Sequence, residues 1–117
     1  MARPQLPTTS NWHFDIDFEG IGWLTIETPR GPVNTLSRET IAELEELVVR
    51  FEELHAAGEL LGVVLLSNKD TGFIAGADVT EFDAMSDPGV LPAALRRTHA
   101  LFDRIEAAKY PFVAGIY

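Results

Sequence analysis

The residues best suited to chemistry lie in one short segment, Gly72-Phe73-Ile74-Ala75-Gly76-Ala77-Asp78-Val79. Small side chains around Gly76 let a ligand approach the backbone closely, and glycine adopts dihedral angles that other residues avoid. A backbone N–H group can then point into a pocket, which an oxyanion hole requires in order to stabilise negative charge developing on an oxygen. The segment is therefore a candidate oxyanion-hole loop.

The flanking residues indicate which elements hold this loop. The apolar run at residues 62–68 precedes it and is typical of a buried strand. Asp78 and Glu81 form a D-x-x-E pattern, which is typical of the start of a short helix. A tight strand-to-helix turn without a ligand would have the same pattern, so on these residues alone both interpretations stay open.

The rest of the chain predicts an α/β fold. Alternating apolar and polar residues predict a hairpin over 14–28. A helix should follow the N-cap Ser37 and end before Gly58, and a second helix should span 91–108 before a strand at 112–116. The inward positions are Ile41, Leu44, Leu47, Val48, Phe51 and Leu54 in the first helix, and Leu91, Leu95, Leu101, Phe102 and Ile105 in the second. This order of elements favours parallel crossovers in one sheet.

Composition narrows the class of protein. The 117 residues are 46% hydrophobic and 23% charged, which suits one small globular domain. A net charge of −9 argues against nucleic acid or an anionic membrane as the main partner. The chain has no cysteine, no apolar run of membrane-spanning length and no signal-peptide pattern, so we expect a cytoplasmic protein. Residues 1–12 are expected to be a flexible N-terminus and residues 13–117 the folded domain.

From Phe14 to its last residue the chain resembles the crotonase (enoyl-CoA hydratase/isomerase) superfamily. Family members often have F-x-A-G-A-D-[ILV], which residues 73–79 match. Residues 29–37, which contain Pro32-Val33-Asn34-Thr35-Leu36-Ser37, resemble the P-x-x-N-[AVT]-L-[ST] turn before the family's first long helix. Residues 111–116 resemble its P-[VT]-[VI]-A-x-[IV] strand. Residues 74–82 are most similar to the hydratase domains of multifunctional fatty-acid oxidation proteins.

The resemblance implies a fold and a site. The fold would be a ClpP/crotonase-like spiral of ββα units, of which this chain is a truncated N-terminal part that ends after a core strand. The backbone N–H of Ala77 would donate to the thioester oxygen of an acyl-CoA substrate. The groove for substrate and coenzyme A would be lined by Val33, Asn34, Thr35, Ala75, Gly76, Asp78 and Val79. The implied activity is that of an enoyl-CoA hydratase (a lyase) or isomerase in fatty-acid β-oxidation, with coenzyme A as part of the substrate and no separate cofactor.

The negative charge of the chain opposes binding of coenzyme A, because coenzyme A is itself polyanionic. Arg30, Arg38 and Lys69 are the cations nearest the two candidate loops. Asp78 and Glu81 are expected to cap a helix rather than to transfer protons. The acidic side of the first helix is expected to be a solvated face, formed by Glu43, Glu45, Glu46, Glu52 and Glu53. His13, His55 and His99 lack ligand spacing, so no metal site is expected.

Whether the chain is an enzyme by itself stays open. In the family, both catalytic glutamates and the second oxyanion donor follow the strand that residues 111–116 resemble, so neither glutamate has a counterpart here. The alternative is a truncated or split fragment that acts as an interaction or assembly piece, either as a homo-oligomer or with the C-terminal part of the same enzyme. A third interpretation, an unrelated small α/β binding domain, would leave the two matching motifs as coincidence.

Overall fold

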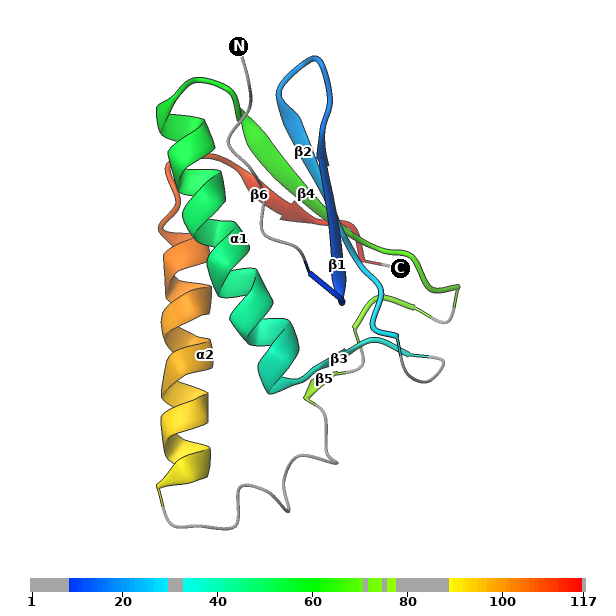
Figure 1. Cartoon of the computed structure of the whole chain (residues 1–117), viewed down its shortest axis with the longest axis vertical. Coiled ribbons are helices and arrows are strands. Elements are labelled where there is room, and N and C mark those ends of the chain that lie inside the picture. Colours follow the sequence, from blue (N-terminus) through cyan, green and yellow to red (C-terminus); the bar gives the residue numbers. More distant parts are fainter. Residues whose placement is uncertain (1–8, 30–32, 71, 75, 78–88, 117) are drawn as a thin grey trace.

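The main sheet has four strands in the order β1-β2-β4-β6 (Figure 1). The computed structural model describes residues 9–29, 33–70, 72–74, 76–77 and 89–116. The strands are β1 (Trp12–Ile16), β2 (Ile21–Ile26), β4 (Gly62–Ser67) and β6 (Phe112–Ala114). The pair β1–β2 is antiparallel, whereas β2–β4 and β4–β6 are parallel. The predicted hairpin and the predicted parallel strands are therefore confirmed, although β6 ends two residues earlier than expected.

The helix α1 (Arg38–Ala56) covers one face of this sheet (Figure 1). Its N-cap is Ser37, as predicted, and the Ser37 hydroxyl accepts a hydrogen bond from the backbone N–H of Thr40. Gly58 follows the helix with a φ of 78°, which suits a glycine after a helix end. All six predicted inward residues are buried: Ile41, Leu44, Leu47, Val48, Phe51 and Leu54. Burial of each such side chain contributes about 1.5–3 kcal/mol to folding.

The helix α2 (Val90–Glu106) lies beside α1 rather than over the centre of the sheet (Figure 1). Leu101 is buried, as predicted, but Leu95 is 49% exposed and Phe102 is 44% exposed, so the prediction that they point inward was wrong. A helix that packs mainly on another helix buries only a narrow stripe, which explains the difference. The side chain of Leu91 lies outside the described part of the chain.

The acidic side of α1 is also less solvated than expected. Arg97 and Arg104 of α2 form ion pairs with Glu45 and Glu52 of α1. Glu43 accepts hydrogen bonds from the backbone N–H of Asn11 (3.1 Å) and from its side-chain amide (2.7 Å). These three glutamates therefore bind other segments of the chain.

The N-terminal residues 9–12 lie in the fold, although the sequence led us to expect flexibility as far as residue 12. Trp12 is buried in β1, and its indole N–H donates to the backbone oxygen of Thr40 at 3.0 Å. Asn11 is also buried through its contacts with α1. Residues 1–8 lie outside the described part of the chain.

Asp17 closes the β1–β2 hairpin. Its carboxylate accepts hydrogen bonds from the N–H groups of Glu19 (2.9 Å) and Ile21 (3.0 Å) and from the indole of Trp23 (3.0 Å). The indole bond, followed by that from Ile21, holds the pKa of Asp17 below its ordinary value of 3.8, because each stabilises the ionised form. The half-exposed Trp23 is thus tied to the turn through its polar edge.

A substitution at Gly22 would show how tightly the core under the hairpin is packed. A Cβ atom there would lie 2.6 Å from the Phe14 ring and 2.9 Å from Leu60. We expect Gly22→Ala to lower the free energy of unfolding by about 1–3 kcal/mol, because overpacking forces the Phe14 ring off its contact with Phe51. Urea denaturation of the chain measures the change.

The matched control for this prediction is a double-mutant cycle with Phe14→Leu. The smaller side chain frees space at Gly22, so the double variant should be more stable than the sum of the two single effects implies. Strictly additive effects would show that the clash with Phe14 does not cause the loss.

Candidate functional site

The two candidate loops meet in a small parallel sheet. The strand β3 (Thr35–Leu36) pairs with β5 (Gly76–Ala77), with Thr35 opposite Gly76 and Leu36 opposite Ala77. The pair lies next to the N-terminal end of α1 (Figure 1). The structure thus pairs Thr35 with Gly76, and the side chain of Asn34 reaches the Phe73 oxygen in the loop before β5, whereas Val33 precedes the pairing. The other predicted site residues, Ala75, Asp78 and Val79, lie outside the described residues, as does the expected short helix with Glu81.

Gly76 is required by backbone geometry rather than by space. Its φ is 126°, a value that side-chain-bearing residues rarely adopt. Among the described atoms none lies within 4 Å of the position that a Cβ would occupy at Gly76, so steric crowding does not demand glycine there. The conformation directs the chain into the pairing with β3, which explains why a glycine precedes Ala77.

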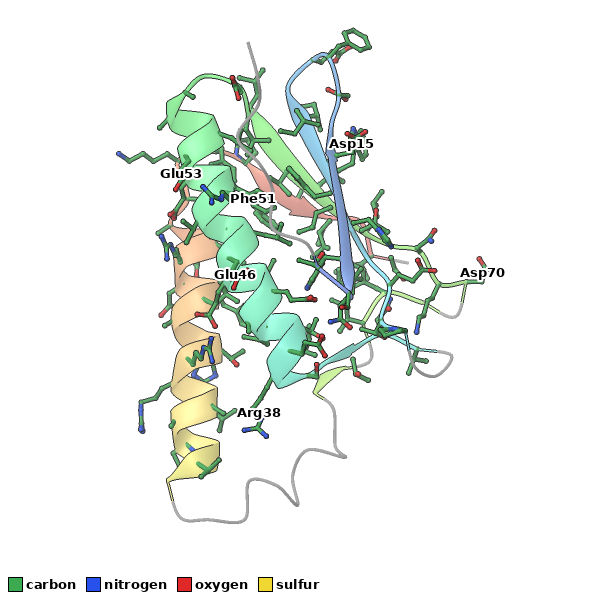
Figure 2. All side chains as sticks on the ribbon, in the orientation of Figure 1. Asp15, Arg38, Glu46, Phe51, Glu53 and Asp70 are labelled. Carbon is green, nitrogen blue, oxygen red and sulfur yellow. The ribbon has the colours of Figure 1, made fainter. Side chains whose placement is uncertain are left out.

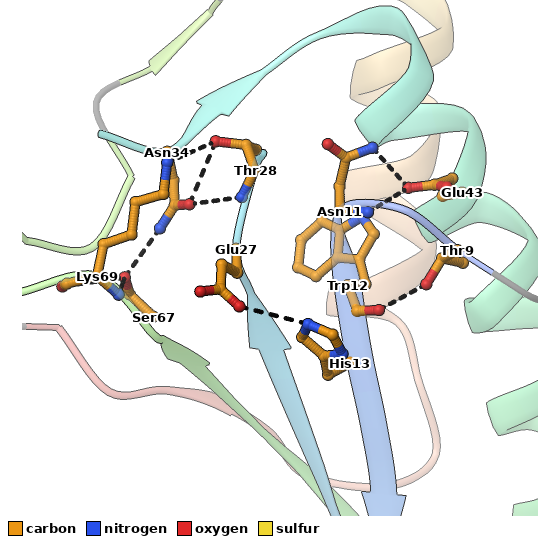
Figure 3. A network of polar contacts seen from close by, with 10 residues as sticks. All are labelled: Thr9, Asn11, Trp12, His13, Glu27, Thr28, Asn34, Glu43, Ser67 and Lys69. Atoms are coloured by element: carbon orange, nitrogen blue, oxygen red, sulfur yellow. Dashed lines mark hydrogen bonds and ion pairs between the residues drawn. The ribbon is translucent and has the colours of Figure 1, made fainter. Parts of the chain in front are cut away.

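Asn34 forms the centre of a buried hydrogen-bond network at this site (Figure 3). Its side chain is 1% exposed. The amide oxygen accepts from the backbone N–H of Thr28 at 3.0 Å. The amide nitrogen donates to the hydroxyl of Ser67 at 2.8 Å and to the backbone oxygen of Phe73 at 2.9 Å. One side chain therefore joins the segment after β2, the end of β4 and the loop that leads into β5.

Lys69 brings a positive charge to the same turn. Its ammonium group donates to the hydroxyl of Thr28 and to the backbone oxygen of Val33, both at 3.2 Å. Of the other two cations expected near the loops, Arg38 is exposed at the start of α1 (Figure 2) and Arg30 lies outside the described residues. Lys69 therefore contacts the Val33–Thr35 turn directly and contributes its charge there.

The sequence did not point to the side chains of Asn34, Thr28 and Ser67 as a unit. It indicated Asn34 only through its backbone, and Thr28 and Ser67 only as the ends of strands. The sequence signal that could have indicated this network is that both small hydroxyl residues lie where a predicted strand ends. Parallel strands end at the same edge of a sheet, so such residues come close together. Ile26 of β2 is paired with Ser67 of β4, so the two chain segments leave the sheet together.

The described part of the chain offers neither a metal centre nor a membrane span. Within it, no cluster of three or more His, Cys, Asp or Glu side chains could hold a metal ion. No helix in the same residues is both long and apolar enough to cross a bilayer.

The fold matches that of known enzymes. An enoyl-CoA hydratase/isomerase from Xanthobacter autotrophicus Py2 superimposes with a TM-score of 0.78 over 93% of this chain and 39% of its own, at 19% identity. An enoyl-CoA hydratase from Bacillus anthracis gives 0.77 over 91% of this chain and 39% of its own, at 22% identity. The chain therefore has the crotonase-type α/β fold that its sequence predicted.

Sequence similarity gives a more specific relationship. The fatty acid oxidation complex subunit alpha of Shewanella sp. (strain W3-18-1) is 34% identical over 99 residues, which are 85% of this chain and 14% of that protein. The same subunit from Shewanella oneidensis is also 34% identical over 99 residues. No family model matches the chain. Sequence and fold together confirm the resemblance to the enoyl-CoA hydratase/isomerase (crotonase) superfamily, and the chain is similar to a short region of fatty acid oxidation proteins.

The role of the Gly76 backbone conformation in the β3–β5 pairing can be tested by substitution. We expect Gly76→Ala to cost about 1–3 kcal/mol in local strain, because alanine disfavours a φ of 126°. The strain should weaken the β3–β5 pair, so amide exchange at Thr35 and Leu36 should accelerate, as measured by NMR.

Gly89→Ala is the matched control, because Gly89 also has a positive φ (94°) but lies at the start of α2, and no described atom lies within 4 Å of the position that a Cβ would occupy there. That variant should leave exchange at Thr35 and Leu36 unchanged. If Gly76→Ala also leaves them unchanged, the conformation of Gly76 does not maintain the pairing.

Proposed function

We propose that this chain is the thioester-polarising part of an enoyl-CoA hydratase/isomerase-type enzyme of fatty-acid β-oxidation. In this proposal the backbone N–H of Ala77 donates to the thioester oxygen of an acyl-CoA and stabilises the enolate. The observation that carries the proposal is the parallel pairing of β3 with β5, because it places Thr35 opposite Gly76 and Leu36 opposite Ala77, directly after the Val33–Thr35 turn. The similarity to fatty acid oxidation proteins and the crotonase-type fold support it.

A backbone donor at Ala77 suits this chemistry for physical reasons. A donor held by secondary structure needs no reorganisation when charge develops on the oxygen, and it contributes about 3 kcal/mol to transition-state stabilisation. The side chain at position 77 takes no part, so alanine and similar small residues serve equally well. The chemistry depends on where the strand β5 lies, not on a titratable group.

The substrate in this proposal is a trans-2-enoyl-CoA. The Val33–Asn34–Thr35 turn would line the groove for the pantetheine and nucleotide, together with Ala75, Gly76, Asp78 and Val79. Lys69 supports this assignment, because its ammonium group lies 3.2 Å from the backbone oxygen of Val33 and offsets part of the chain's negative charge locally. The fold itself does not choose between hydration, isomerisation and related reactions.

Turnover is proposed to need residues beyond these 117. Hydration requires a base that takes a proton from water and an acid that protonates the α-carbon, each contributing about 10²–10⁴-fold. The catalytic glutamates of the family match no position in this sequence, and Asp78 and Glu81 fit a helix-capping pattern.

A second candidate function, an assembly piece without activity of its own, is favoured by exposed apolar side chains. Val113 is 55% exposed and Ile116 is 75% exposed at the β6 edge of the sheet. Such an edge with apolar side chains favours association with further polypeptide. The proposed partner is a second copy of the chain or another segment of the same enzyme.

Ligand binding tests the first proposal. Titration with acetyl-CoA should shift the backbone amide NMR signals of Ala75, Ala77 and Val79 before those of other residues, with weak affinity because of the net charge of −9. Inorganic pyrophosphate is the control for simple charge attraction. Shifts confined to Lys and Arg side chains, or equal shifts with pyrophosphate, would contradict a thioester site.

An activity assay tests whether this chain polarises the thioester but lacks the groups that transfer protons. We expect no measurable hydration of crotonyl-CoA by this chain, followed as loss of the conjugated enoyl-thioester absorbance. The same sequence extended through a G-x-x-x-G-G-G-x-E segment and the following elements should hydrate it. Turnover by the chain alone that Glu81→Gln or Asp78→Asn abolishes would show that the acid–base residues lie within it.

A further inference from the structure

We infer that Asn34 is the positioning residue of this site: its buried side-chain amide sets the register of β3 against β5 and so the direction of the Ala77 N–H. The inference rests on the proposed function for its catalytic meaning, but its structural part concerns the chain without ligand. Asn34 does not touch the thioester in this scheme, because its side chain is buried within the protein.

The hydrogen-bonding capacity of the amide is matched to its surroundings. Both N–H groups of the Asn34 amide have acceptors, the Ser67 hydroxyl and the Phe73 backbone oxygen. The amide oxygen accepts from the backbone N–H of Thr28 at 3.0 Å and contacts its hydroxyl at 3.4 Å. A carboxylate has no donors and a hydroxyl has only one, so neither could make all these bonds. This site therefore requires an amide.

The β3–β5 pair is so short that its register needs a constraint from outside the two strands. It contains two residue pairs, too few to define a register by side-chain alternation alone. Asn34 immediately precedes β3, and its partner Phe73 lies three positions before Gly76. The bond between them thus connects both strands just before they pair. A slip of one residue would place Asn34 out of reach of the Phe73 oxygen.

The same amide relates the small sheet to the main sheet. Thr28 follows β2, and Ser67 is the last residue of β4. The Ser67 hydroxyl also accepts from the backbone N–H of Lys69 at 3.1 Å, which shapes the chain as it leaves β4. Asn34 therefore holds β3 and the approach to β5 against two strands whose positions the core determines.

The first test uses NMR on the chain without ligand. We expect Asn34→Ala to speed amide exchange at the ladder residues Thr35, Leu36 and Gly76 by about tenfold or more relative to β4 amides, as expected for the loss of a buried hydrogen-bonded group. Asn34→Asp keeps the size of the side chain and its acceptor oxygen but loses both N–H donors, so it should speed exchange at the same residues. If Asn34→Ala does not fold, the exchange rates of Asn34→Asp test the role of Asn34 instead.

The matched control is Thr40→Val, which removes a fully buried hydroxyl that bonds to Ser37 at 2.8 Å in the first turn of α1. It should affect ladder and β4 amides equally. Ser67→Ala keeps the Phe73 bond, so it should speed ladder exchange less than Asn34→Ala. Equal ladder exchange in the Asn34 variants and in Thr40→Val would overturn the inference.

The second test separates the inference from the proposed function. Infrared spectra of acetyl-CoA with a ¹³C-labelled thioester carbonyl should show a lowered stretching frequency when the wild-type chain binds it, because an oxyanion donor polarises the bond. The lowered frequency should disappear in Asn34→Asp and persist in Thr40→Val. No lowering in the wild type would contradict the proposed function while the exchange test still decides the role of Asn34. A lowered frequency that persists in Asn34→Asp would overturn that role.

Discussion

Parallel pairing of β2 with β4 requires the chain to cross from one end of the sheet to the other between them. The helix α1 makes this crossover, and its buried stripe, which includes the fully buried Phe51, forms the core against the sheet. Because the two strands run in the same direction, both end at one edge, where Ile26 is paired with Ser67. The turn that starts α1 and the loop that follows β4 therefore have to lie close together. The β3–β5 pair is a direct result of this topology.

The network around Asn34 converts that proximity into a defined geometry. Buried amides contribute to stability only when their donors and acceptors are satisfied, and a fully satisfied network also selects one arrangement over its neighbours. Here the partners come from three segments, so the arrangement exists only when the main sheet, the turn before α1 and the loop before β5 are all in place. A site that depends on a backbone N–H needs this kind of precision, since no side-chain rotamer can correct an error in the position of a strand.

Much of this fold was predictable because its signals are local. The stripe on α1 repeats along the whole helix and every inward position is buried, and the strand that precedes the glycine-containing loop is present as β4. The apolar pattern of α2 predicted that Leu95 and Phe102 are buried, but both are exposed. Periodicity shows which residues share a face of the helix, but not whether that face packs on a broad sheet or on one helix. The contacts of Asn34 were not predictable, because its partners at Thr28, Ser67 and Phe73 are related only through the tertiary fold.

The charges between the helices have a consequence for the dynamics of the chain. Arg97 and Arg104 tie α2 to α1 at partly exposed positions, where an ion pair contributes about 0–1 kcal/mol and salt screens it. Among the described residues, no side chain caps the start of α2 at Gly89, and the apolar stripe of this helix is only partly covered. These features make α2 a unit whose local opening costs less than unfolding of the sheet. We therefore expect local opening of α2 to precede unfolding of the β2–β4 core, and ionic strength to change how often that opening occurs.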